Sequence, residues 1–179
     1  MSSLHFAKAE WSAAIARGVR QCVLIGLPRA LRETFEHSPD EPLQVFAVGE
    51  EERSAETLAA ALEKSGFDQL KASFFVWLGD AGYRTVDAAL ASLAFIASLP
   101  KGSGVVLDYA VEQCSPGSTT HTALDGLASR VAVAGGSVKY LIQPQAVAAM
   151  LRSLGFEQIV DLAQEELPVS GGRLVSASV

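Results

Sequence analysis

Acidic and phenolic side chains follow several apolar segments of this sequence, at positions where a ligand could be bound. Glu50 lies two residues after the apolar segment from Leu43 to Val48, and Asp80 comes shortly after a second apolar segment. Asp108 and Tyr109 end a third one. A carboxylate placed just past a strand can accept hydrogen bonds from ribose hydroxyl groups. A carboxylate or phenol within hydrogen-bond reach of a substrate can act as a base.

The same residues also have structural interpretations, which the sequence leaves open. Glu50 is the first of three consecutive glutamates, and these fit the first turn of a helix, where the macrodipole favours negative charge. Asp80 fits the position that caps a following helix. Among the polar groups expected at this edge, namely Asp80, Tyr83, Asp108 and Tyr109, no residue is singled out as a catalytic base.

A turn flanked by apolar residues lies near the start of the chain, in the segment VRQCVLIGLPRALR from Val19 to Arg32. It predicts a buried strand, a turn at Gly26-Leu27-Pro28 and the start of a helix. In doubly wound folds the turn after the first strand directs backbone N–H groups at a ligand, and glycine permits close approach. One glycine occurs in many structural turns, so both interpretations remain open.

The periodicity of apolar residues predicts alternating strands and helices that position these groups. Helices are expected at residues 4–18, 29–37, 54–64, 83–99, 123–134 and 144–154. Strands are expected at residues 19–25, 43–48, 72–78, 105–109, 156–162 and 173–179, with a short extended piece at 138–142. Right-handed crossovers make the early strands parallel, and the last two strands, which no helix connects, must be antiparallel neighbours.

Composition limits the class of protein. The 179 residues predict a single domain, 1–179, with one core, and 49% hydrophobic residues are typical of a globular chain. A net charge of −6 argues against nucleic acid as a partner. The absence of a long apolar run or a signal-like start predicts a cytoplasmic protein with no membrane association. Cys22, Cys114 and three scattered histidines predict reduced thiols and no metal site.

Three longer segments carry a resemblance to a known family. IARGVRQCVLIG, which begins at Ile15, is similar to the pattern A-x-x-G-I/V-R-Q-V/C-V-x-L-G. FVWLGDAGYRTVDAALASLAFIASLPKGSGVVLDYA, from Phe75, resembles W-L-G, an amphipathic helix, P-x-G-S and D-Y. RVAVAGGSVKYLIQPQAVAAMLRSLGFEQIVDL, from Arg130, is similar to R-x-A-x-x-G-E-P, a helix and L-G-F. Together these segments resemble the leucine carboxyl methyltransferase-like family of S-adenosylmethionine-dependent O-methyltransferases.

The resemblance implies a fold, a cofactor and a set of binding residues. The fold is α/β and class I methyltransferase-like (Rossmann-like): a mainly parallel sheet with an antiparallel C-terminal strand pair and helices on both faces. The implied activity is methyl transfer from S-adenosylmethionine to a carboxylate or hydroxyl of a small molecule. The implied cofactor-binding residues are Gly26, Leu27, Arg32, Gly49, Glu50, Leu78, Gly79 and Asp80. Catalytic residues stay unassigned.

The chain also departs from that family where the cofactor binds. Gly26 and Arg32 match the family's L-G-A-G-L-D-T-R turn, but Pro28 replaces its second glycine and Ala30 its acidic residue. The family's E-V-D becomes Ala47-Val48-Gly49, so Glu50 would have to serve as the ribose acceptor from one position further on. Little of the family's N-terminal extension precedes Trp11. The alternative function is therefore a non-catalytic relative, a pseudoenzyme that acts as a binding or assembly partner.

A missing strand leads to an expectation about partners. The chain runs from the helix ending near Lys64 directly to the strand before Leu78, so one outer strand of the family is absent. The segment from Leu43 to Val48 then lies at the edge of the sheet, and an apolar edge invites pairing with another chain. We expect a homodimer or a protein partner at this edge.

Overall fold

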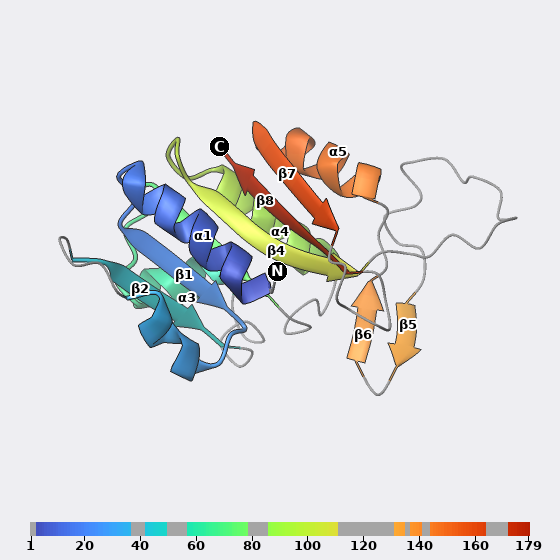
Figure 1. Ribbon diagram of the computed structural model, residues 1–179, viewed down its shortest axis with the longest axis horizontal. Coiled ribbons are helices and arrows are strands. Elements are labelled where there is room, and N and C mark those ends of the chain that lie inside the picture. The colour runs from blue at the N-terminus through green and yellow to red at the C-terminus, as the bar shows by residue number, and fades with distance from the viewer. Residues whose placement is uncertain are drawn as a thin grey trace, which may run out of the picture.

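A computed structural model of the chain describes residues 3–36, 42–49, 57–78, 86–110, 131–134, 137–140, 144–163 and 172–179 (Figure 1). The described helices are α1 (Ser3–Ala16), the 3-10 helix η1 (Arg29–Thr34), α3 (Leu58–Lys64), α4 (Val86–Ala97) and α5 (Pro144–Leu154). The described strands are β1 (Gln21–Ile25), β2 (Gln44–Val48), β3 (Ser73–Trp77), β4 (Gly104–Ala110), β5 (Val131–Ala134), β6 (Ser137–Tyr140), β7 (Gln158–Ala163) and β8 (Gly172–Ser178).

Six strands form one sheet in the order β2-β1-β3-β4-β8-β7. Strands β1 to β4 are parallel, and β8 runs antiparallel to both β4 and β7. This arrangement confirms the predicted fold class, including the reversed pair at the C-terminus. It also places β2 at the edge of the sheet among the described strands.

Helices cover both faces of the sheet. One core cluster joins the sheet to α3, α4 and α5 and includes Val23, Phe75 and Leu151. A second cluster on the opposite face joins it to α1 and η1 and includes Trp11 and Phe35. In Figure 1 α1 crosses in front of the sheet while α3 and α4 lie behind it. Strands β1 and β3 are buried at every position because helices contact both of their faces.

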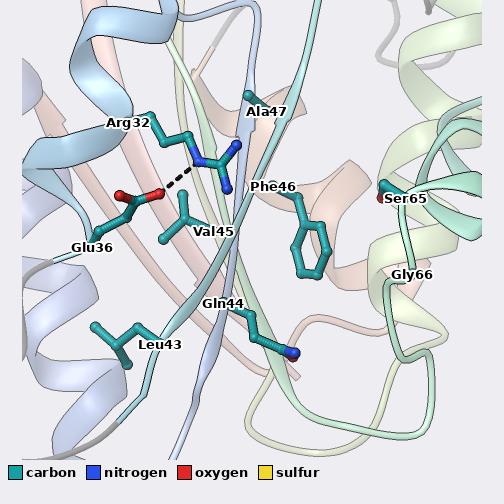
Figure 2. A pocket seen from close by; sticks show the side chains of 9 residues that line it. All are labelled: Arg32, Glu36, Leu43, Gln44, Val45, Phe46, Ala47, Ser65 and Gly66. Atoms are coloured by element: carbon teal, nitrogen blue, oxygen red, sulfur yellow. Dashed lines mark hydrogen bonds and ion pairs between the residues drawn. The ribbon is translucent and has the colours of Figure 1, made fainter.

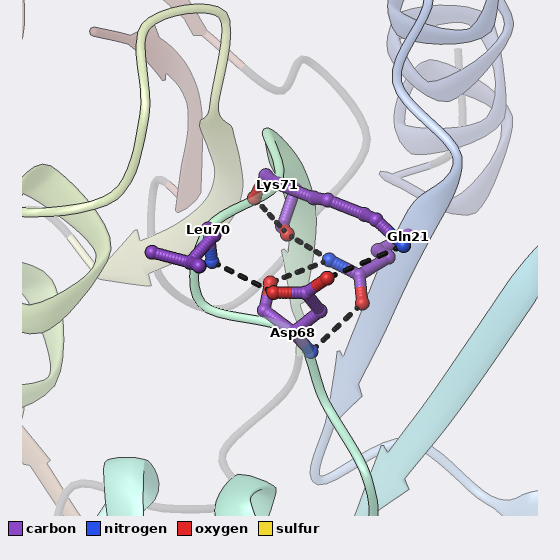
Figure 3. A network of polar contacts seen from close by, with 5 residues as sticks. Gln21, Asp68, Leu70 and Lys71 are labelled. Atoms are coloured by element: carbon purple, nitrogen blue, oxygen red, sulfur yellow. Dashed lines mark hydrogen bonds and ion pairs between the residues drawn. The ribbon is translucent and has the colours of Figure 1, made fainter.

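A network of buried polar groups joins the amino ends of the central strands (Figure 3). Gln21 is fully buried, and its Nε2 donates to the carbonyl of Asp68 at 2.9 Å and to Ser73 Oγ at 3.0 Å. Its Oε1 accepts from the Asp68 amide at 3.0 Å. Ser103 Oγ accepts from the Ser73 amide and extends the network to β4. The amide of Gln21 is thus satisfied within the fold, at the end of the sheet opposite the expected ligand edge.

One predicted helix is wrong in its last turn. We expected a helix over residues 123–134, but Val131–Ala134 forms the strand β5, which pairs antiparallel with β6. Val131 and Val133 alternate with alanines before Gly135 and Gly136, and β-branched residues on both sides of two glycines favour a hairpin over a helix. Residues 123–130 lie outside the described part of the chain, as does the predicted loop at 111–122.

No helix among the described residues is long and apolar enough to cross a bilayer.

Candidate functional site

The carboxyl ends of β1, β2 and β3 meet at one edge of the sheet. Ile25 is in register with Val48 on one side and with Trp77 on the other. The residues that follow each strand, Gly26, Gly49 and Leu78, therefore lie at matching positions on adjacent strands. The structure brings these three predicted residues together, whereas Glu50, Gly79 and Asp80 lie just outside the described residues.

Gly26 has a backbone conformation that favours glycine. Its φ is 70°, in the left-handed region. Its N–H donates to the carbonyl of Val48 at 3.0 Å and so extends the pairing of β1 with β2. The glycine is therefore required by the turn itself, and its amide is engaged within the protein. A ligand at this edge of the sheet would therefore meet no side chain at Gly26.

The turn continues into η1 through Pro28. Pro28 occupies the N-cap position, has no N–H and makes no side-chain cap bond. The Leu31 amide donates to the Pro28 carbonyl at 2.9 Å. Leu27 packs against the core cluster on the α1 face. This turn therefore has one backbone donor fewer than a turn with a second glycine at residue 28.

Arg32 lies beside the edge strand. Its Nε makes an ion pair with Glu36 Oε1 at 2.6 Å, four residues further along and just after η1, and the two side chains are 48% and 40% exposed. Both residues line a groove of about 460 Å³ along β2 (Figure 2). The lining residues of this groove are Arg32, Glu36, Leu43, Gln44, Val45, Phe46, Ala47, Ser65 and Gly66.

The groove has one wall on each face of the sheet. Arg32 and Glu36 come from η1 and the residues after it, on the face covered by α1, and Val45 packs into the core there. Phe46 points to the other face, where its ring meets Phe67 edge to face at 5.6 Å. The floor between the walls is the outer edge of β2 itself, as Figure 2 shows.

A second polar cluster joins β4, β7 and β8. The hydroxyl of Tyr109 donates to Asp161 Oδ2 at 2.7 Å, and Arg173 Nε donates to Asp161 Oδ1 at 2.8 Å. Burial and the hydrogen bond to Asp161 raise the pKa of Tyr109, and the hydrogen bond to Asp161 raises the pKa of Arg173. Tyr109 was considered from sequence as an available polar group, but its hydroxyl is committed to this cluster.

Sequence reasoning missed Asp161 and Arg173. Asp161 lies more than fifty residues after Tyr109, and only the antiparallel register of β8 with β4 and β7 brings the three side chains to one face. The available signal was an aspartate within the apolar strand β7 and an arginine at the start of β8. Asp108, the neighbour of Tyr109, is partly buried.

Cys22 is fully buried, and burial raises the pKa of its thiol, so the thiolate required for nucleophilic or metal chemistry is disfavoured. Cys114 lies outside the described residues. Within the described ranges no cluster of three or more histidine, cysteine, aspartate or glutamate residues could hold a metal ion.

Comparison with known proteins gives structural matches and no sequence matches. No protein-family profile matches the sequence, and no curated protein matches it. A solved S-adenosylmethionine-dependent methyltransferase from Archaeoglobus fulgidus is similar, with a TM-score of 0.58, 14% identity, and coverage of 98% of this chain and 94% of that one.

Two further solved structures resemble the chain. The N-terminal domain of EvdMO1, determined in the presence of SAH and D-fucose, has a TM-score of 0.61 and 17% identity over 99% of this chain and 82% of that one. A putative methyltransferase from Thermobifida fusca has a TM-score of 0.55 and 14% identity over 98% and 78%. These likenesses show that the chain has the fold of class I methyltransferases. They do not confirm the leucine carboxyl methyltransferase-like family in particular.

Proposed function

We propose that this protein binds S-adenosylmethionine at the carboxyl edge formed by β1, β2 and β3, and that it is an O-methyltransferase of small molecules related to the leucine carboxyl methyltransferase-like family. The observation that carries the proposal is the shared register of Gly26, Gly49 and Leu78. In parallel α/β sheets ligands bind outside the carboxyl ends of the strands.

The described residues at this edge are compatible with part of an S-adenosylmethionine site. Gly26 and Gly49 lack side chains at two adjacent strand ends, so a ligand can approach the backbone there. Leu78 is buried beside them in the core cluster on the α1 face, and we propose that it gives this edge an apolar boundary. Glu50 and Asp80 follow these strands in sequence, and their carboxylates are the acceptors we assign to the hydroxyl and ammonium groups of the cofactor. The EvdMO1 domain, determined in the presence of SAH, supports this choice of ligand.

Methyl transfer requires the protein mainly to hold the two reactants in position. S-adenosylmethionine, when bound, would supply an electrophilic methyl group, with S-adenosylhomocysteine as the leaving group once the methyl carbon bonds to the acceptor. The chain's residues have to orient the acceptor and exclude water. A carboxylate acceptor needs no base, whereas a hydroxyl acceptor needs one within hydrogen-bond reach. Tyr109 is committed to Asp161, and no base is assigned among Asp80, Tyr83 and Asp108, so we propose a carboxylate acceptor, which needs none.

A specific observation also favours a second candidate, a methyltransferase-fold protein without catalytic activity. The amide of Gly26 is engaged with Val48, and Pro28 has no amide to offer. Arg32 is paired with Glu36 beside β2. The turn that binds the cofactor in the family thus lacks the donor of a second glycine, and a protein that retains the fold for binding another chain would lose this donor without cost.

Isothermal titration with S-adenosylmethionine and with S-adenosylhomocysteine separates the two candidates. The enzyme interpretation predicts saturable binding in the micromolar range, with one site per chain. The Gly26→Asn variant should lose most of this affinity, because asparagine tolerates a left-handed φ but fills the edge with a side chain.

The matched control is Gly18→Asn. Gly18 has a φ of 95°, no atom lies within 4 Å of the position that a Cβ would take, and the residue precedes β1 at the opposite end of the sheet. This variant carries the same kind of backbone strain and should bind like the wild type. Absence of binding to the wild type at millimolar ligand would exclude the enzyme and leave the non-catalytic candidate.

A further inference from the structure

The outer edge of β2 offers backbone groups in a defined direction. The Gln44 amide donates to the Arg20 carbonyl at 2.9 Å, and the Val48 carbonyl accepts from Gly26 at 3.0 Å. Backbone groups alternate in direction along a strand, so Gln44, Phe46 and Val48 face β1. The N–H and C=O groups of Val45 and Ala47 consequently face away from it. Within the ranges that the structure describes, β2 pairs with β1 alone.

The two charged side chains beside this edge, Arg32 and Glu36, lie at different levels along β2. Figure 2 shows Arg32 at the level of Ala47 and Phe46 along β2, and Glu36 at the level of Val45, further toward the amino end of the strand. Both lie on the same face of the sheet and are about half exposed, at 48% and 40%. A positive group therefore lies toward the carboxyl end of β2 and a negative group toward its amino end.

We propose that a second copy of this chain docks on the edge, with its β2 antiparallel to the first and a two-fold axis through Phe46. In this register Val45 lies opposite Ala47 of the second copy. These two residues can exchange N–H···O=C bonds in both directions, because both direct their backbone groups outward. The same exchange occurs again on the other side of the axis, and the two sheets become continuous.

The two-fold arrangement makes the charges complementary. Reversing the strand direction places Arg32 of one copy near Glu36 of the other, and the reverse pair forms by symmetry. The axis is perpendicular to the sheet, so both pairs lie on the face that carries η1. A parallel copy would instead place like charges at the same level. The contact uses the same surface on both chains, so it closes as a dimer and does not propagate into a filament.

The size of the edge sets the expected strength of this dimer. Stable interfaces bury about 1,200–2,000 Å² in total. A five-residue strand with two flanking side chains presents less surface than that. The dimer should therefore form reversibly as the protein concentration rises. The inference does not depend on methyl-donor binding, so it stands or fails separately from the proposed function.

Sedimentation velocity of the full chain tests the dimer directly. The wild type should sediment as an 18.8 kDa monomer when dilute and approach twice that mass as the concentration rises toward millimolar. The Val45→Pro variant should remain a monomer, because proline removes an outward donor and leaves the bonds to β1 intact. A wild type that remains monomeric at every concentration overturns the proposal.

Charge reversal tests the register. Arg32→Glu should abolish self-association, since the introduced carboxylate would meet Glu36 of the second copy on both sides of the axis. Glu36→Arg should abolish it for the converse reason. An equimolar mixture of the two variants should form a heterodimer, because the first variant then presents two carboxylates to two guanidinium groups of the second. Failure of the mixture to associate contradicts this register even if the wild type dimerises.

Lys101 and Glu157 provide the matched control. They form an exposed ion pair at 3.7 Å, remote from β2, with side chains 83% and 68% exposed. Lys101→Glu and Glu157→Arg change the net charge by the same amounts as the test variants. Each should dimerise like the wild type. Loss of association in these controls would show that net charge, and not the β2 edge, governs the equilibrium.

Discussion

At the scale of single residues, Gln21 shows why the amino end of the sheet is structural. It is an amide among apolar neighbours in β1, and each of its side-chain polar atoms has a partner in the structure. Burying an amide without partners is costly, so the network is needed to keep this residue in the core. Residues at the amino ends of parallel strands are expected to stabilise the fold, whereas residues at the carboxyl ends are expected to bind ligands.

Replacing Gln21 by leucine should destabilise the fold by about 2–3 kcal/mol. The leucine is close to glutamine in size but leaves the Asp68 amide, the Asp68 carbonyl and the Ser73 hydroxyl without their buried partner. Urea unfolding followed by circular dichroism measures the change. A midpoint equal to that of the wild type would contradict the structural role.

The control for this variant is Lys71→Ala in the same region (Figure 3). Lys71 pairs with Asp68 Oδ2 at 3.2 Å, but its side chain is 61% exposed. The pKa of Asp68 is lowered first by the hydrogen bond from the Leu70 amide and then by Lys71, so the carboxylate keeps a partner in this variant. The unfolding midpoint should hardly change.

Positions of candidate residues were more predictable from sequence than their contacts. Gly26 and Gly49 could be placed because each directly follows an apolar run, and Leu78 because it ends one, since parallel strands end at the same edge. The engagement of Gly26 with Val48 could not be predicted, because it depends on which strands are neighbours. The pairing of Arg32 with Glu36 could be predicted from their spacing of four residues. The location of this pair beside β2 could not, because no sequence pattern indicates it.

At the scale of elements, the cluster of Tyr109, Asp161 and Arg173 joins three strands around the antiparallel pair. The Tyr109 pKa is raised in the folded protein, while in the unfolded chain the phenol ionises near its ordinary value of 10.0. Below that pH the stabilising contribution of the phenol is complete. As the pH rises above it, the unfolded state releases the proton first and stability is lost.

The Tyr109→Phe variant should be less stable than the wild type by about 1 kcal/mol at neutral pH. The difference between the two proteins should shrink as the pH rises above 10, because the variant has no phenol to ionise. Urea unfolding at a series of alkaline pH values measures this. A difference that stays constant or widens over that range would falsify the assigned role of the hydroxyl.

The order of elements was predictable wherever sequence signals agreed. The absence of a helix between the last two strands required them to be antiparallel, and β8 pairs in this way with both β4 and β7. The antiparallel pairing of β5 with β6 was not predicted, because the alanines of this segment favour a helix while its alternating valines favour a strand. The strand preference prevails in the structure.

At the scale of the whole molecule, the protein has a methyltransferase-like sheet whose β2 lies at an edge in the described structure. We propose that the edge at the carboxyl ends of β1, β2 and β3 binds the cofactor and that the outer edge of β2 forms an interface. The net charge of −6 disfavours nucleic acids as partners, but it does not oppose either proposal, since the methyl donor carries positive groups.

The central claim is that the carboxyl edge of the sheet binds the methyl donor, and an amide-resolved NMR titration with S-adenosylhomocysteine tests it most directly. We predict saturable chemical-shift changes at Gly26, Gly49 and Leu78, with little change at Gln21, Ser73 and Ser103 at the opposite end of the sheet. Unchanged spectra at millimolar ligand, or changes confined to the amino end, would contradict the claim.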